Sequence, residues 1–157
     1  MLEVLRRCEH IVTIFCKGAI AFFFIVLIVA AALQVVSRFV FNSPISWTDE
    51  VCIFSMVWMG MIGAAYAVRT GSHIKVDLLP NSIGPQAARM LYRVLLLFVL
   101  LFAFVMLRYG SALVAGNMRQ ISAALKVPMG YIYLCFPLSG ILMLYYTILE
   151  FLGKSEA

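Results

Sequence analysis

The chain has 157 residues, of which 64% are hydrophobic and 12% charged, and its mean hydropathy is +1.03. Soluble domains are about half apolar and about a quarter charged, so this composition excludes a soluble globular protein and predicts a single membrane domain over residues 1–157. The formal net charge is +5, but most basic residues flank apolar runs, which indicates a role in membrane topology and not in nucleic-acid binding.

The N-terminal segment, residues 1–17, is predicted to form an amphipathic helix at the membrane interface. Its apolar residues, including Val4, Leu5 and Ile11, recur at helical spacing, and charged residues occupy the opposite face. The uncharged run that begins at Gly18 is long enough to cross the bilayer and contains no small-residue cleavage site. We therefore expect a retained first span over about residues 18–36 rather than a signal peptide.

Three further apolar runs predict spans at about residues 51–68, 90–109 and 127–149. The third run is short, but Arg93 and Arg108, which flank it, can extend to the interfaces and lengthen the usable helix. The connection between the second and third spans contains glycine and proline residues and is predicted to be irregular. The expected fold class is therefore an all-α integral membrane protein with four transmembrane helices.

The distribution of basic residues predicts that both termini face the cytoplasm. With the N-terminus inside, eight of the twelve Lys and Arg residues lie on the inner side, and the outer side holds the other four, Arg38, Arg108, Arg119 and Lys126. Cytoplasmic segments carry the excess of positive charge in membrane proteins. The irregular connection between the second and third spans is then cytoplasmic, and residues 41–50 and 110–126 are periplasmic.

The middles of the predicted spans contain no Asp, Glu, Lys, Arg or His. Ion-coupled transporters place such groups near the bilayer midplane, so an autonomous four-span channel or small exporter is the disfavoured alternative. The four cysteines show no C-x-x-C spacing, and the two histidines, His10 and His73, lie outside the spans, which opposes a membrane redox enzyme. We predict no catalytic residue, no metal site and no cofactor.

The second span carries small residues at the spacing of close helix packing. Gly60 and Ala64, and likewise Gly63 and Ala67, lie four positions apart, which lets another backbone approach closely. That backbone belongs either to this chain or to a different subunit. In the fourth span, Pro137 cannot donate a hydrogen bond to the carbonyl four residues earlier, which predicts a kink or a partner contact.

Two adjacent carboxylates, Asp49 and Glu50, stand at the start of the second span. Ser46 to Asp49 fits the S-x-x-D capping pattern, and negative charge is favourable at a helix N-terminus. Glu50 is expected at the same depth as Arg38, just past the first span. The two residues are therefore predicted to form an ion pair at the outer interface.

Several of these residues belong to longer stretches that resemble one family. The run Leu33–Asp77, with Val127–Leu144 further on, resembles the small membrane subunit of tripartite ATP-independent periplasmic (TRAP) transporters, the DctQ-like family. The resembling motifs are Q-V-x-x-R-F, W-x-x-E, G-A-A and R-x-G-x-H-I-x-V-D, at residues 34–39, 47–50, 63–65 and 69–77.

This resemblance implies a multi-pass protein of the bacterial inner membrane that acts as a non-catalytic scaffold in a sodium-coupled uptake system. The implied partners, besides the lipid bilayer, are a larger membrane subunit that carries the sodium and substrate sites and a soluble periplasmic binding protein. The binding protein would deliver an organic anion such as a C4-dicarboxylate, a keto acid or a sialic acid.

On this interpretation the outer loops help to dock the binding protein. The predicted docking residues are Trp47, Asp49, Arg119 and Lys126, which give the surface mixed charge. Such charges set encounter rate and register more than affinity. The alternative for Lys126 is a plain anchor in the lipid headgroups.

The R-x-G-x-H motif is interpreted as a structural corner on the inner side. Gly71 permits the turn, His73 and Asp77 bond locally, and Arg69 anchors to lipid phosphate. A metal site made of His73 and Asp77 is disfavoured because two ligands are too few.

Overall fold

The computed structural model describes residues 2–43, 45–70 and 85–153. Its helices are α1 (Leu2–Phe39), α2 (Ser46–Arg69), α3 (Pro85–Gly116), α4 (Met129–Tyr133) and α5 (Cys135–Gly153). Four segments are long and apolar enough to cross a membrane: Glu9–Phe39, Ser46–Arg69, Met90–Gly116 and Met129–Phe151, the last made of α4 and α5 together. The predicted all-α fold with four spans is confirmed; the first three helices extend beyond their predicted bounds at both ends, and the fourth span begins two residues later and ends later than predicted.

Helix α1 runs without a break through both the predicted amphipathic segment and the predicted first span. Its 38 residues give a length of about 57 Å at about 1.5 Å per residue, whereas the hydrocarbon core is about 30 Å thick. The helix is thus much longer than a crossing requires. That its N-terminal part lies at the membrane interface stays a prediction, as does the orientation.

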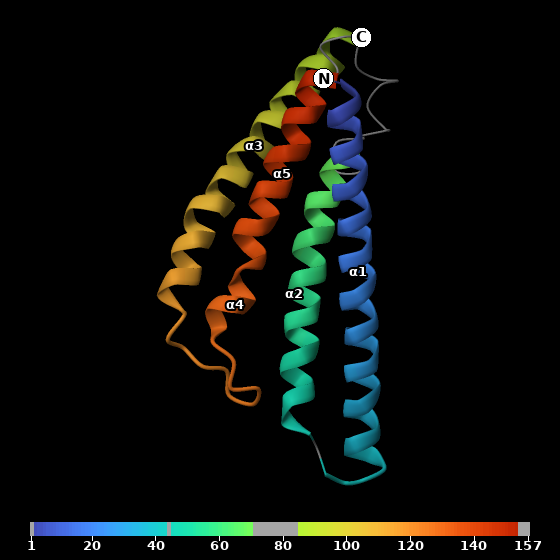
Figure 1. Cartoon of the computed structure of the whole chain (residues 1–157), viewed down its shortest axis with the longest axis vertical. Helices are drawn as coiled ribbons and strands as arrows, with labels where there is room; N and C mark the ends of the chain where they lie inside the picture. Colours follow the sequence, from blue (N-terminus) through green and yellow to red (C-terminus); the bar gives the residue numbers. More distant parts are fainter. Residues whose placement is uncertain (1, 44, 71–84, 154–157) are drawn as a thin grey trace.

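The helices lie side by side in a single layer (Figure 1). Helix α1 packs against α2, α2 against α5, and α5 against α3, so the fourth span lies between the second and the third. Both termini are at one end of the layer, and the α1–α2 and α3–α4 connections are at the other. We call the end with the two connections the outer end, following the charge count, and the opposite end the inner end.

Few of the apolar side chains are buried inside this layer. The main core cluster is formed by Cys16, Ile62, Ala65, Val68, Ala103, Met143 and Tyr146. The Phe23 ring stacks on Trp58 with 5.5 Å between ring centroids and joins α1 to α2. The share of buried residues in the most apolar stretch of a span ranges from 6% in the first span to 33% in the fourth. Most of the apolar surface therefore remains for lipid or for another protein.

Helices α3 and α5 approach each other closely at glycines that the sequence analysis did not single out. A Cβ atom added to Gly140 would lie 3.0 Å from the backbone of Ala103 and Leu107, and one added to Gly110 would lie 3.0 Å from Pro137. A Cβ atom added to Gly60 or Gly63 would meet nothing within 4 Å. An added side chain at those two residues of the predicted packing face would thus have no close neighbour among the described residues.

The fourth span is interrupted at Leu134, between α4 and α5 and three residues before Pro137, where a kink or a partner contact was predicted. Proline has no N–H group to bond the carbonyl of Tyr133, so one hydrogen bond of a regular helix is missing there. The backbone N–H of Leu138 donates to the carbonyl of Leu134 at 3.2 Å, where the helix resumes. Pro137 itself faces Gly110 of α3.

Candidate functional site

At the outer end, the carboxylate of Glu50 joins α2 to the connection between α3 and α4. One oxygen accepts a hydrogen bond from the backbone N–H of Ala124 at 2.8 Å, and the other accepts from the N–H of Leu125 at 2.9 Å. Hydrogen bonds to a carboxylate are stronger than those between neutral groups. One side chain of α2 therefore fixes a loop that lies more than seventy residues away in the sequence.

The connection held by Glu50, residues 117–128, also has hydrogen bonds of its own, and we call it the outer connection. The backbone N–H of Ser122 donates to the carbonyl of Val127 at 2.9 Å, and the N–H of Val127 donates back to the Ser122 hydroxyl at 3.2 Å. Lys126 adopts a left-handed backbone conformation (φ 58°), which is uncommon for residues other than glycine. The outer connection thus has a specific, hydrogen-bonded shape.

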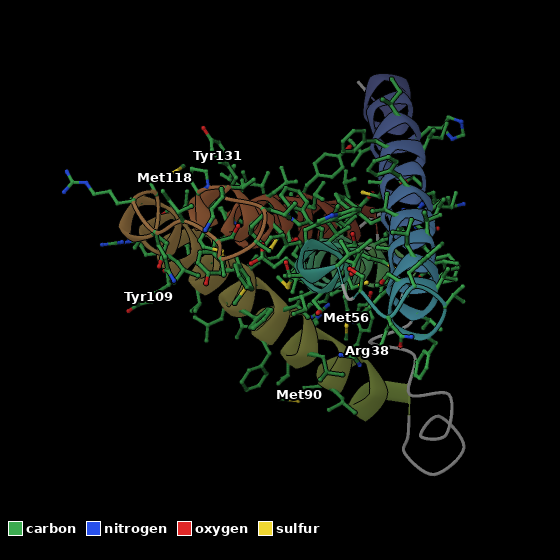
Figure 2. The ribbon with its side chains drawn as sticks, turned by 90° about the horizontal axis from the view of Figure 1, so that it is seen from below. Arg38, Met56, Met90, Tyr109, Met118 and Tyr131 are labelled. Atoms are coloured by element: carbon green, nitrogen blue, oxygen red, sulfur yellow. The ribbon has the colours of Figure 1, made fainter. Side chains whose placement is uncertain are left out.

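The predicted ion pair between Arg38 and Glu50 is wrong. Both oxygens of Glu50 are bound by the outer connection, and the ion pair found among the described residues joins Arg69 to Glu9. Arg38 is exposed. In the view from the outer end, it lies in the half of the molecule that contains α1 and α2 (Figure 2). The sequence placed the two residues at similar depth, but depth does not define the face of a helix.

The predicted cap by Ser46 is also wrong. The residue that precedes the first turn of α2 is Ile45, with an extended backbone and no side-chain capping bond, and the Thr48 hydroxyl donates to its carbonyl at 2.7 Å. Ser46 is already helical, so its hydroxyl is not in the flanking position from which a cap acts. Asp49 does lie in the first turn, and it accepts a hydrogen bond from the Gln34 side chain of α1.

The residues predicted to dock a partner are all exposed at the outer end. Trp47 and Asp49 lie at the start of α2, and Arg119 and Lys126 lie on the outer connection. Apolar side chains accompany them, because Ile121 is 60% exposed and Tyr131 54% exposed. Figure 2 shows Tyr131 and Met118 together at the edge of the layer far from α1. The docking role itself stays a prediction.

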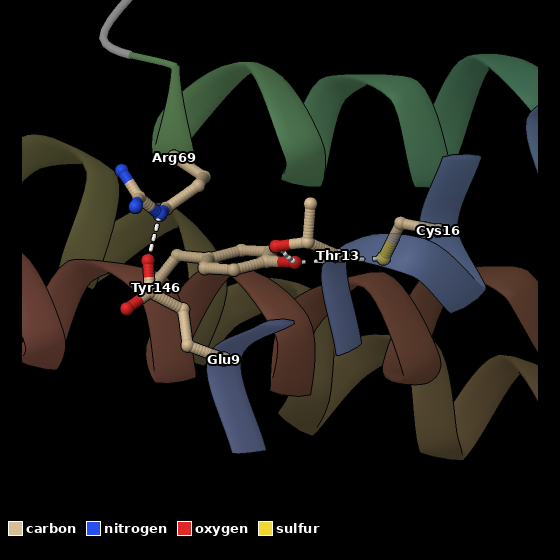
Figure 3. A network of polar contacts seen from close by, with 5 residues as sticks. All are labelled: Glu9, Thr13, Cys16, Arg69 and Tyr146. Atoms are coloured by element: carbon tan, nitrogen blue, oxygen red, sulfur yellow. Dashed lines mark hydrogen bonds and ion pairs between the residues drawn. The ribbon is translucent and has the colours of Figure 1, made fainter. Parts of the chain in front are cut away.

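At the inner end, polar contacts connect three helices (Figure 3). Arg69 of α2 forms an ion pair with Glu9 of α1, and the Tyr146 hydroxyl of α5 lies 3.5 Å from the Thr13 hydroxyl and donates to the Cys16 sulfur at 3.7 Å. Arg69 was predicted to bind lipid phosphate, and its pairing with Glu9 was not predicted. The pair could have been predicted from the opposite charges of Glu9 and Arg69, which lie near the inner ends of consecutive helices.

The remaining residues of the predicted inner corner, Gly71, His73 and Asp77, lie outside the described residues. Beside that corner, the ammonium group of Lys17 lies 5.8 Å from the centre of the Tyr66 ring. Such a cation over an aromatic ring adds a modest attraction between α1 and α2.

A further polar contact joins α3 and α5 at the same end, where the Tyr92 hydroxyl donates to the Glu150 carboxylate at 2.5 Å. With the contacts around Tyr146 and Arg69, the inner end is therefore cross-linked over the width of the layer. The outer end is cross-linked by Asp49 and Glu50. Charged side chains thus join the helices near the ends of the spans.

Comparison with known proteins places this architecture in a family. Residues 25–156 match the family described as tripartite ATP-independent periplasmic transporters, DctQ component. The C4-dicarboxylate TRAP transporter small permease protein DctQ of Rhodobacter capsulatus is 34% identical over 62% of this chain and 44% of its own length. The protein of the same name from Vibrio cholerae is 35% identical over 59% of this chain and 39% of its own length.

A third relative is the sialic acid TRAP transporter permease protein SiaT of Haemophilus influenzae, which is 28% identical over 71% of this chain but over 18% of its own length. The matched segments span less than half of each of these three relatives. The family match itself covers most of this chain. The chain therefore belongs to the DctQ component family of TRAP transporters and is a multi-pass protein of the bacterial inner membrane.

Proposed function

We propose that this chain is the small, non-catalytic scaffold subunit of a sodium-coupled uptake system for an organic anion. It packs against a larger membrane subunit that carries the sodium and substrate sites, and it helps to dock a soluble periplasmic binding protein. The names of the relatives support C4-dicarboxylates or sialic acids as substrate classes, and keto acids are the third class that the resemblance implies.

The observation that carries the scaffold role is the open, single layer of helices. Helices α1 and α3 form its two edges, and the helices between them pack mainly against their neighbours along the layer, with a smaller contact between α5 and α1 at Tyr146. A pathway for a solute needs helices around it, whereas a layer offers two broad faces. An arrangement of this kind suits a protein that supports another membrane protein on one face.

The surface around Gly60 and Gly63 supports packing against a different subunit. Both glycines lie on α2, and both have open space where a Cβ atom would be. Small residues at a helix interface let a second backbone approach closely in the membrane. Of the two alternatives for this surface, a partner helix is therefore favoured over a helix of the same chain.

The positions of the charged side chains also support a scaffold role for this chain and a transport role for the larger subunit. In the described spans, the contacts that involve charged residues lie near the helix ends, at Glu9 and Arg69, at Tyr92 and Glu150, and at Glu50. Sodium and substrate sites of secondary transporters lie near the bilayer midplane. We therefore assign those sites to the larger subunit.

Reconstitution into liposomes tests this proposal. This chain, the larger membrane subunit proposed to pair with it and the binding protein are combined singly and together, and uptake of labelled substrate is measured with and without a sodium gradient. We expect accumulation only with all three proteins and the gradient. Sodium-driven accumulation by this chain alone would refute the scaffold role, and full accumulation without this chain would show that it is dispensable.

A further inference from the structure

We infer that Glu50 is a positioning residue that holds the outer connection in a fixed shape, as a preformed docking surface for an acidic face of the soluble binding protein. The inference rests on the proposed function and on the predicted orientation, which place the outer connection in the periplasm. It adds to them the residue that maintains the surface and the charge of the partner face.

The first step is the geometry of the clamp. Glu50 is on α2, but its two oxygens bind successive backbone N–H groups, those of Ala124 and Leu125, at the tip of the outer connection. At the base of this segment, the N–H of Met129 donates to the carbonyl of Gln120 at 2.8 Å. The outer connection is thus fixed at its base by its own backbone and at its tip by a side chain from another helix.

The second step is the charge of the surface that this clamp presents. Residues 117–128 contain two basic side chains, Arg119 and Lys126, and no acidic one. Both are exposed, and no ion pair involving either is found in the described part of the chain. The neighbouring carboxylate of Glu50 is occupied by the backbone of the outer connection. The outer connection itself is therefore basic, whereas Asp49 of α2 is the acidic member of the predicted docking residues. A partner face rich in carboxylates complements the outer connection.

The third step is the reason to expect a protein and not the lipid headgroups. The exposed apolar side chain of Ile121 lies in the outer connection between the two basic residues, and protein interfaces combine apolar contacts with charges that set the register. A surface that is already ordered also lowers the entropic cost of binding. Fluid headgroups place no demand on the shape of a loop, whereas a folded partner does.

The variant Glu50→Gln tests the clamp. A glutamine has a single acceptor oxygen, and its NH₂ group would face one of the two N–H donors, so the outer connection should become mobile. Glu150→Gln is the matched control, because it makes the same substitution at the inner end, where the side chain accepts a hydrogen bond from Tyr92 of α3. Ala124→Pro is the second variant, since it removes the backbone N–H that donates to Glu50 and leaves α2 unchanged.

Mobility is followed with a nitroxide spin label on Ala123→Cys, since Ala123 is exposed within the outer connection. The background replaces Cys8 and Cys52 with serine, and the buried Cys16 and Cys135 stay in place. The same labelled complexes, reconstituted with the larger subunit, are titrated with binding protein in the uptake assay.

We expect Glu50→Gln to increase label mobility and to raise the half-saturating concentration of binding protein about threefold to tenfold, at low and at high salt alike. Glu150→Gln should change neither. The pair Arg119→Glu and Lys126→Glu should leave the label immobile but raise the half-saturating concentration, with a smaller effect at high salt because the charges are then screened. Should Glu50→Gln prevent assembly, Ala124→Pro must show the same two effects.

Three results would overturn the inference. One is a mobile outer connection with an unchanged half-saturating concentration, which separates the clamp from docking. Another is an equal effect of Glu150→Gln, which would show that the defect follows the loss of any inter-helix carboxylate and not the loss of the clamp. The third is a defect of the Arg119 and Lys126 variants that follows the anionic lipid content of the liposomes and not the binding protein. Failure of the wild-type complex to take up substrate would instead count against the proposed function.

Discussion

Asp49 and Glu50 are adjacent on α2, yet their side chains bind different parts of the molecule. Asp49 accepts a hydrogen bond from Gln34 of α1, and Glu50 binds the outer connection. Successive positions on a helix are about 100° apart, so neighbouring side chains point in different directions. The pair of carboxylates thus joins the first hairpin, α1 and α2, to the connection of the second.

The absence of an ion pair between Arg38 and Glu50 has a direct experimental consequence. Arg38→Glu should leave the thermal stability of the purified chain close to wild type, because Arg38 is exposed and the ion pair of the described residues lies elsewhere. Glu50→Arg should lower the melting temperature, because two backbone donors lose their acceptor. The double swap should be no more stable than Glu50→Arg alone. Recovery of stability in the double variant would instead be evidence for an ion pair between Arg38 and Glu50.

At the scale of the helices, the sequence was sufficient to predict the four spans but not their neighbours. Apolar runs reveal a spanning helix, because the bilayer requires the whole segment to be apolar. The same requirement makes all faces of such a helix similar, so the pattern does not tell which face packs. Gly60 and Gly63 matched a packing motif and have open surroundings, whereas Gly110 and Gly140 fit no recognised motif and lie at close contacts between α3 and α5.

Substitution of glycines on two helices tests this difference. In Gly140→Ala the new methyl group would lie 3.0 Å from backbone atoms of Ala103 and Leu107, and since backbone cannot move aside cheaply, we expect a loss of about 1–3 kcal/mol in unfolding free energy. Gly60→Ala has open space and should leave the stability of the isolated chain unchanged. Gly60→Leu should reduce co-purification with the larger subunit. Denaturation in mild detergent and pull-down assays measure the two effects, and destabilisation by Gly60→Ala alone would contradict the assignment.

At the scale of the whole molecule, the layer is cross-linked at both ends and open on both faces. The predictable part was its topology, since an even number of spans brings both termini to one end, as Figure 1 shows. The position of α5 between α2 and α3 was not predictable, because it depends on contacts between segments far apart in the chain. The same holds for the clamp by Glu50, since its partners are backbone N–H groups, which every residue except proline carries.

The orientation of this layer in the membrane is the prediction on which docking depends. Eight of the twelve basic residues would flank the inner end, and segments rich in Lys and Arg stay in the cytoplasm. A reporter enzyme that is active only after export should therefore be active when fused after Asn117, at the start of the outer connection, and inactive when fused after Thr70 or after residue 153. High activity after Thr70 together with low activity after Asn117 would reverse the layer and place Arg119 and Lys126 in the cytoplasm, out of reach of a periplasmic partner. Moving the charge excess provides the control: adding three lysines beside Asn117 should shift the activity ratio toward the opposite orientation, because the bias in Lys and Arg is what sets it.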